Sequence, residues 1–219
     1  MSDMSSIARC IDHTILRADL KKEEIFQHCQ EAIKYRFKTV CVPPYFVKYA
    51  KELIQETQTG VCTVLGFPLG YNGISSKMEE AKSILNQGCD ELDFVINISA
   101  VKNQDWKTID DEFDRLVTIS HMKNSVIKAI LETSLLTEQE IEILCNKAIE
   151  HNVDFVKTST GMSTKGAEIE TIKLMKNIVQ DKVKIKASGG IKTKQQALSF
   201  LEAGADRLGT SSSIKIIEG

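Results

Sequence analysis

Two hydrophobic patterns alternate along the chain. Short runs rich in Val, Ile, Phe and Thr are apolar on both faces, and they end near Thr14, Val42, Gly66, Asn97, Glu132, Ser159, Ser188 and Thr210. Runs of this kind predict strands of a parallel sheet that is covered by helices. Between the runs, apolar residues recur at helical spacing, as they do at Ile141, Leu144, Cys145, Ala148 and Ile149. Eight strand and helix units therefore follow one another.

Three of the expected helices begin with a recognisable sequence pattern. A hydroxyl residue is followed three positions later by Glu or Gln in the pairs Ser76 and Glu79, Thr137 and Glu140, and Thr193 and Gln196. In such a capping box each side chain bonds a backbone N–H group that the first helical turn leaves free. The pattern predicts three helix N-termini at these positions.

The eight units predict one domain over residues 1–219. The chain has only three prolines and no low-complexity linker that would mark a domain boundary. Eight strand and helix units are typical of a (β/α)₈ TIM barrel. A doubly wound open sheet is the alternative, because periodicity does not distinguish the two. The number of units and the lack of a GxGxxG motif favour the barrel.

Composition excludes several classes of protein. The net charge of −2 offers no basic excess for a nucleic acid, and no run approaches the roughly 20 apolar residues of a membrane helix. The six cysteines include no CxxC pair, which suits small buried thiols in a reducing cytoplasm. The four histidines include no HxH or HExxH pair, and Ala167 stands where a phosphate-binding Walker loop needs Lys. We therefore expect no metal and no cofactor.

Charged residues within apolar strands are the main candidates for chemistry. They are Asp93, Lys157 and Lys186. A buried lysine is rare unless it is paired, so an ion pair in the core or a lysine that reaches water is the structural alternative. Both lysines, however, lie near the carboxyl ends of consecutive strands, where the active sites of barrels are found. The pattern predicts an active site with two lysines and a carboxylate.

Two adjacent lysines favour one type of reaction. Each ammonium group disfavours protonation of the other, and burial adds to this effect, so that one amine can titrate near about 7–8 instead of about 10.4. A neutral amine attacks a carbonyl group and forms a Schiff base. The resulting iminium withdraws electrons from the adjacent carbon, which allows a C–C bond to break without a metal. Asp93 can supply acid and base catalysis.

A phosphate site is predicted beside these residues. Gly189 and Gly190 follow the seventh strand, and the segment 209–212 (Gly-Thr-Ser-Ser) follows the eighth. Backbone N–H groups approach an anion closely where side chains are absent, and these two loops form the usual phosphate site of such barrels. A glycine pair alone is more often a plain turn. The two loops together favour phosphate binding.

Four motifs carry a family resemblance. They are the segments Gly66–Gly70 (GFPLG), Leu92–Asn97 (LDFVIN), Phe155–Gly161 (FVKTSTG) and Lys186–Ile191 (KASGGI). Through them the chain resembles the deoxyribose-phosphate aldolases, class I enzymes of the short bacterial type. The resemblance extends from Ile11 to the C-terminus.

The resemblance implies a reaction and a set of site residues. The reaction is the reversible cleavage of 2-deoxy-D-ribose 5-phosphate to acetaldehyde and D-glyceraldehyde 3-phosphate. Lys157 would form the Schiff base, Lys186 would perturb its amine and help to move protons, and Asp93 would act through a water. The substrate-binding positions would be Asp12, Thr14, Cys41, Lys128 and Thr158. The phosphate-binding positions would be Gly161, Gly189, Gly190, Gly209, Ser211 and Ser212.

The sequence departs from the family pattern at some positions, and other functions remain as alternatives. Met162, Lys192 and Ser134 stand where the family more often has Phe, Arg and Gly, which bears on rate and specificity and not on the reaction. The alternatives are another phosphate-binding TIM-barrel lyase or isomerase, and a barrel kept as a binding protein. The presence of Lys157 and Asp93 argues against the latter. We expect a cytoplasmic enzyme whose partners are the phosphorylated sugar and acetaldehyde; assembly into a homodimer or higher oligomer is left open.

Overall fold

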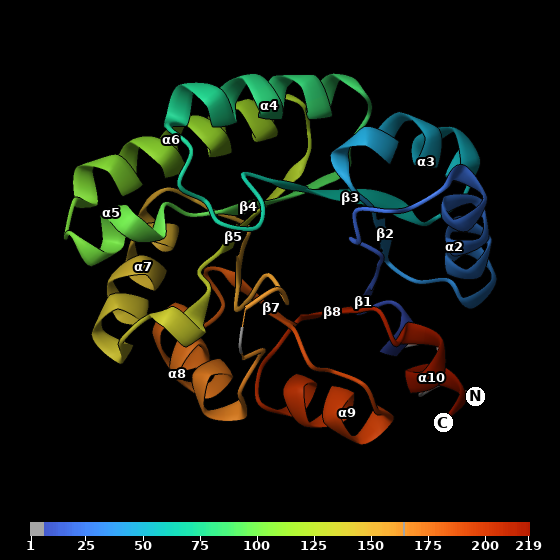
Figure 1. The fold of residues 1–219 in the computed structure, drawn as a ribbon. Helices are drawn as coiled ribbons and strands as arrows, with labels where there is room; N and C mark the ends of the chain where they lie inside the picture. The colour runs from blue at the N-terminus through green and yellow to red at the C-terminus, as the bar shows by residue number, and fades with distance from the viewer. Residues whose placement is uncertain (1–6, 164) are drawn as a thin grey trace.

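Eight parallel strands close into a barrel in the computed structural model, which describes residues 7–163 and 165–219. The strands pair in chain order, and the last pairs with the first (Figure 1). They are β1 (Ile11–Thr14), β2 (Thr39–Cys41), β3 (Gly60–Leu65), β4 (Glu91–Val95), β5 (Val126–Ile130), β6 (Phe155–Lys157), β7 (Lys184–Ser188) and β8 (Arg207–Thr210). Each strand ends within two residues of its predicted end. The TIM barrel is confirmed, and the open sheet is wrong.

Helices surround the barrel as an outer ring (Figure 1). They are α2 (Lys22–Tyr35), α3 (Val47–Ile54), α4 (Ile74–Asn86), α5 (Ile98–Lys102), α6 (Trp106–Met122), α7 (Glu138–Glu150), α8 (Ile169–Val179), α9 (Lys194–Glu202) and α10 (Ser213–Glu218). Short 3₁₀ turns, η1 (Pro44–Phe46) and η2 (Thr133–Leu135), follow β2 and β5. Among the described residues, no helix has the length and apolar content needed to cross a bilayer.

Two of the three predicted helix starts are confirmed. Capping boxes join Thr137 to Glu140 at α7 and Thr193 to Gln196 at α9. The start predicted at Ser76 is wrong, because α4 begins earlier, after an extended Gly73. Ser76 lies in the first turn, where its N–H group donates to the Gly73 carbonyl oxygen at 3.0 Å.

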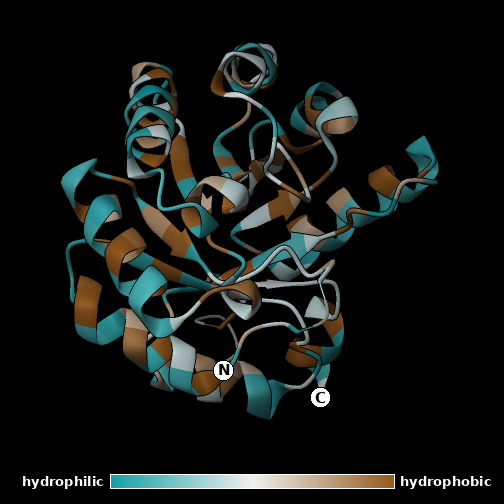
Figure 2. Ribbon diagram, turned by 60° about the vertical axis from the view of Figure 1, so that its left-hand side comes forward, coloured by the Kyte–Doolittle hydropathy of each residue, from teal (hydrophilic) through white to brown (hydrophobic). Residues whose placement is uncertain are grey.

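The two faces of each strand lie in different surroundings. Outward-facing residues such as Val40, Ile127 and Leu208 are fully buried in one continuous apolar core between the strands and the helices. The helices carry hydrophilic as well as hydrophobic residues, as expected for an outer layer (Figure 2). Successive side chains of a strand alternate in direction, so Asp93 and Lys128 face the inside of the barrel. TIM barrels usually fill this space with branched apolar residues; here charged side chains occupy it.

Candidate active site

The three charged strand residues predicted as catalytic meet at one point inside the barrel. Lys157 Nζ donates to Asp93 Oδ2 at 2.8 Å, and Lys186 Nζ donates to the same oxygen at 2.7 Å. Lys157 and Lys186 are register partners on β6 and β7, which places both amines at one height in the barrel. All three side chains are buried. The strand alternation seen in the sequence therefore brings the two lysines and the carboxylate into direct contact.

Further charged side chains from neighbouring strands extend this cluster. Lys128 Nζ on β5 lies 2.7 Å from both Asp93 Oδ1 and Glu91 Oε2. Asp12 on β1 forms an ion pair with Lys186 through one oxygen. Its other oxygen accepts a hydrogen bond from Arg207 Nη1 at 2.6 Å, and the same guanidinium nitrogen lies 2.8 Å from Glu91 Oε2.

The sequence analysis missed two members of this cluster, Glu91 and Arg207. Glu91 stands two positions before Asp93, and Arg207 stands two positions before Gly209. Residues two apart on a strand share a face. The same period that placed Asp93 inside the barrel could therefore have placed both of them there.

The pKa values of the cluster follow from opposing effects of burial and charge. Burial alone would raise the pKa of Asp93, but Lys128, Lys157 and Lys186 hold it well below its usual range. Burial would lower the pKa of Lys186, whereas the Asp12 and Asp93 carboxylates raise it above its ordinary value. The same balance, with Asp93 as the first favourable partner, raises the pKa of Lys128. Asp93 is thus ionised and Lys186 is charged at neutral pH.

Two buried thiols adjoin the cluster. Cys62 Sγ lies 3.3 Å from Asp93 Oδ1, to which it donates, and 3.5 Å from Lys128 Nζ, from which it accepts. Cys41 is its register partner on β2, and the adjacent Cys62 side chain lowers the pKa of the Cys41 thiol. Both thiols are free. The interpretation of the cysteines as small buried hydrophobes is therefore incomplete for this pair, which belongs to the polar interior.

A cavity of about 1060 Å³ opens above the cluster at the carboxyl ends of the strands. Of the catalytic candidates, Lys157 lines it. The other predicted site residues that line it are Thr14, Gly161, Gly189, Gly190, Gly209, Ser211 and Ser212. The remaining predicted residues, Asp12, Cys41, Asp93, Lys128, Thr158 and Lys186, lie outside the lining, and all are buried. Direct contact of these six with substrate stays a prediction.

The glycines after β7 have a backbone that other residues rarely adopt. Gly189 and Gly190 have φ angles of +89° and +79°, in the left-handed region. A Cβ atom on Gly189 would lie 2.8 Å from the Gly166 Cα atom, so the two loops approach each other closely. This turn exposes backbone to the cavity, as a phosphate site requires.

At the end of β8 and in the loop that follows, Gly209 and Ser212 have roles within the protein that the sequence did not predict. A Cβ atom on Gly209 would lie 3.0 Å from the Lys186 Cε atom, so this glycine makes room for the lysine. The Ser212 N–H group already donates to Thr210 Oγ1 at 2.9 Å. Three cationic side chains that line the cavity, Arg17, Lys192 and Lys215, were not among the predicted site residues. They outnumber the two side-chain carboxylates of the lining, Glu31 and Glu218, which favours an anionic ligand.

Comparison with known proteins identifies the family of the chain. The profile of the DeoC/LacD family aldolases matches residues 6–216. The chain is a member of the DeoC/LacD aldolase family. A deoxyribose-phosphate aldolase of Thermococcus gammatolerans is 46% identical over 215 residues, which cover 97% of this chain and 96% of the relative. One from Finegoldia magna is 46% identical over 209 residues, or 95% and 97% of the two chains.

A solved structure supports the same assignment. The tetrameric deoxyribose phosphate aldolase from Aeropyrum pernix superimposes with a TM-score of 0.92 at 30% identity. The match covers 100% of this DeoC/LacD aldolase and 92% of that chain.

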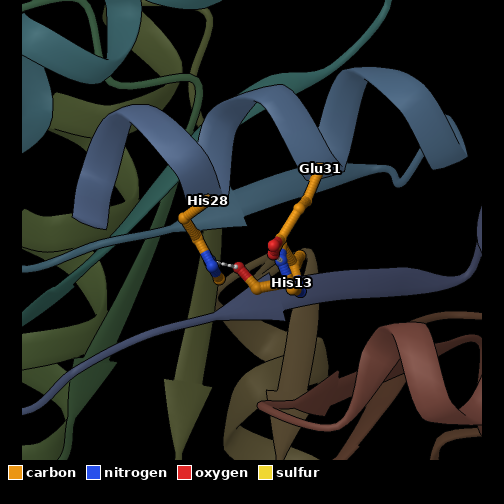
Figure 3. A group of neighbouring side chains, drawn as sticks. All are labelled: His13, His28 and Glu31. Carbon is orange, nitrogen blue, oxygen red and sulfur yellow. Dashed lines mark hydrogen bonds and ion pairs between the residues drawn. The ribbon is translucent and has the colours of Figure 1, made fainter. Parts of the chain in front are cut away.

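Two groups of possible metal ligands occur among the described residues of this DeoC/LacD aldolase. His13, His28 and Glu31 form one group, on β1 and α2 (Figure 3). The imidazole rings of His13 and His28 stack at 3.7 Å with 15° between the planes, and His13 Nε2 lies 3.1 Å from Glu31 Oε2. Asp12, Cys62 and Glu91 form the other group, in which both carboxylates are already bonded to Arg207. In both groups most of the possible ligand atoms already contact other protein atoms, but His13 Nδ1 is buried without a hydrogen-bond partner.

The stacked histidines predict a pH-dependent stability. Burial lowers the pKa of His13 to about 4 and that of His28 to about 3, whereas an unfolded histidine titrates near about 6.5. Below this value the unfolded chain binds more protons, so stability falls as the pH drops toward the folded values. We expect each histidine to lower the free energy of unfolding by about 2 kcal/mol between pH 7 and pH 5.

Urea denaturation of the wild-type protein and of the His28→Leu variant at both pH values measures this effect. The variant loses the hydrogen bond from His28 to the His13 carbonyl oxygen, so its stability at pH 7 also changes. The comparison therefore rests on the difference between the two pH values. An equal pH dependence in the two proteins would contradict the assignment to His28.

Proposed function

We propose that the protein is a class I aldolase that reversibly cleaves 2-deoxy-D-ribose 5-phosphate to acetaldehyde and D-glyceraldehyde 3-phosphate. One observation carries this proposal: the Lys157 amine lies on the cavity wall and shares a carboxylate oxygen with a second lysine. Relatives at 46% identity over nearly the whole chain are named deoxyribose-phosphate aldolases. The cationic lining suits a phosphorylated sugar.

The reaction starts on the open-chain aldehyde of the sugar. The neutral Lys157 amine attacks C1 and forms a carbinolamine, which loses water to give a protonated Schiff base. The iminium accepts the electron pair of the C2–C3 bond as this bond breaks, while the C3 hydroxyl group loses its proton and becomes the aldehyde of D-glyceraldehyde 3-phosphate. The enamine that remains takes up a proton at C2. Hydrolysis then releases acetaldehyde and the amine, and no cofactor takes part.

Asp93 and Lys186 act in this scheme mainly through their charges. An Asp93 carboxylate with a pKa well below its usual range is a weak base, but it orients both amines by accepting their hydrogen bonds. Lys186 keeps its proton because Asp12 and Asp93 raise its pKa. We therefore assign to Asp93 the positioning of the nucleophile and to Lys186 a fixed positive charge beside it. Solvent in the cavity completes the proton transfers.

The retro-aldol assay tests the proposal. Purified protein is mixed with 2-deoxyribose 5-phosphate, and consumption of the glyceraldehyde 3-phosphate released is followed with a coupling enzyme. Turnover is expected without added metal and in the presence of a chelator. Another phosphate-binding TIM-barrel lyase or isomerase is the alternative function. Such an enzyme would leave the sugar intact, and acetaldehyde with borohydride would not label it.

The phosphate group is expected to contribute strongly to catalysis. Two or more charge-assisted hydrogen bonds from the glycine loops are lost with a substrate that lacks the anion. We expect plain 2-deoxyribose to show a kcat/KM at least about a hundredfold lower than the phosphorylated sugar. Steady-state kinetics with both sugars measures the ratio. Equal values would show that these loops do not bind phosphate.

Three further expectations belong to this proposal. We take residues 1–219 as one catalytic domain. The six free thiols suit a reducing compartment, and we propose the cytoplasm. The Aeropyrum pernix neighbour is described as tetrameric, and we propose that this chain also assembles with copies of itself.

A further inference from the structure

The ion pairs inside the barrel form a closed ring. Arg207 is bonded to Glu91, Glu91 to Lys128, and Lys128 to Asp93. Asp93 is bonded to Lys186, Lys186 to Asp12, and Asp12 back to Arg207. Cations and anions alternate at every step around the ring. All six side chains are at most 8% exposed, so the ring is largely removed from water.

The ring is balanced in charge without Lys157. Its three cations, Lys128, Lys186 and Arg207, face three anions, Asp12, Glu91 and Asp93. Lys157 is attached to the outside of the ring at Asp93 Oδ2, which Lys186 already occupies. A proton on Lys157 therefore adds a positive charge that no carboxylate of the ring is left to balance.

We infer that Glu91 and Arg207, on the side of the ring away from the cavity, act as positioning residues that keep Lys157 as a surplus cation and so favour its neutral, nucleophilic amine. This inference rests on the proposed Schiff-base function. A buried charge that is not balanced is unfavourable, and the cluster is balanced when the Lys157 amine is neutral. Lys157 is also the catalytic candidate that lines the cavity, so its proton can leave to solvent.

Ionisable groups from seven neighbouring strands surround Lys157. From β1, β4, β5, β7 and β8 come the six members of the ring. From β2 and β3 come the thiols of Cys41 and Cys62. Burial raises the pKa of the Cys62 thiol, which keeps it neutral, whereas the neighbouring Cys62 side chain lowers the pKa of the Cys41 thiol. Neither Glu91 nor Arg207 lines the cavity above the cluster. They therefore act on the amine through their charges and not through contact with the substrate.

Two isolated changes to the ring should act in opposite directions. In Glu91→Gln the ring carries one extra positive charge, so the acid limb of the kcat/KM profile should move to lower pH. In Arg207→Met it carries one extra negative charge, so the limb should move to higher pH. Each shift should be on the order of one pH unit, as expected for a charge several ångströms away at an effective dielectric of about 20. The acid limb of the kcat/KM profile reports the pKa values of essential groups in the free enzyme.

Two companion variants separate charge from structure. The double variant Glu91→Gln/Arg207→Met removes one cation and one anion, so its acid limb should return to the wild-type position. Arg207→Lys keeps the positive charge, so its acid limb should also lie at the wild-type position. Glu112→Gln is the matched control, because Glu112 forms an equally buried ion pair with Lys77 outside the ring. That control is expected to lose stability, but its acid limb should not move.

The outcomes test the ring independently of the reaction. A wild-type protein that neither cleaves the sugar nor is labelled with acetaldehyde would contradict the proposed function. An active wild-type protein whose Glu91→Gln and Arg207→Met limbs stay in place, or move in the same direction, would overturn the inference. If Arg207→Met does not fold, the shift of Glu91→Gln to lower pH, set against the unmoved limb of Glu112→Gln, still decides the question.

Discussion

Replacement of Lys157 by alanine is expected to abolish covalent labelling by acetaldehyde and borohydride. Borohydride reduces a Schiff base to a stable secondary amine, so labelling requires the amine that forms it. Lys157 lines the cavity and Lys186 does not, which makes Lys157 the amine that substrate reaches. We also expect kcat/KM to fall by roughly 10⁴-fold or more, the scale on which loss of a covalent nucleophile acts. Mass spectrometry of the reduced adduct identifies the labelled residue.

Lys184→Ala serves as the control for this experiment. Lys184 lies on the adjacent strand β7 but is exposed at the opposite end of the barrel from the cavity. Its replacement should leave both the label and the activity intact. An adduct that maps to Lys186, or a fully labelled Lys157→Ala protein, would show that the nucleophile is a different lysine.

Asp93→Asn is expected to damage both activity and folding. The Asp93 carboxylate accepts hydrogen bonds from three buried lysines, Lys128, Lys157 and Lys186. Loss of one partner of a buried ion pair lowers stability by about 3–5 kcal/mol, and here three cations lose the same partner. Because the amine is also no longer oriented, we expect kcat/KM to fall by at least about a hundredfold. Urea denaturation and steady-state kinetics measure the two effects.

The pH dependence of this loss follows from the lowered pKa of Asp93. A carboxylate with a lowered folded pKa contributes stability above its unfolded value of about 3.9, and this contribution is lost as the pH falls through the folded value. The difference between the wild type and Asp93→Asn should therefore persist from pH 7 to pH 5. Asp110→Asn is the control, because Asp110 also bonds two side chains, Lys147 and His151, but it lies near the surface. A stability loss for Asp93→Asn as small as for Asp110→Asn would contradict the central role of Asp93.

The number and order of the strands could be predicted from the sequence because two independent patterns indicate each strand. Each is apolar on its outer face, and each is followed by a helix with its own apolar period. The start of α4 could not be predicted, because Gly73 and Ser76 both suit a helix N-terminus and only the backbone shows which one is used.

The sequence predicted that Asp93, Lys157 and Lys186 come together, but it did not predict the further ion pairs between strands. The period of two along β4, β6 and β7 places Asp93, Lys157 and Lys186 inside the barrel. The ion pairs of Asp12, Glu91 and Arg207 join strands that are distant along the chain, and their partners depend on how the barrel closes. The sequence also placed Asp93 near the two lysines without showing that one of its oxygens accepts hydrogen bonds from both amines, because spacing along one strand does not reveal contacts between strands.

The separation of the apolar core from the charged interior has a consequence for protein engineering. Outward-facing strand residues such as Val156 and Ile185 belong to the apolar core, whereas the proposed chemistry depends on their immediate neighbours along the same strands. Substitutions that repack the layer under the helices can therefore raise heat resistance without altering the electrostatics at the nucleophile. A combinatorial library restricted to the outward-facing strand positions should yield enzymes with higher thermal stability and unchanged substrate preference.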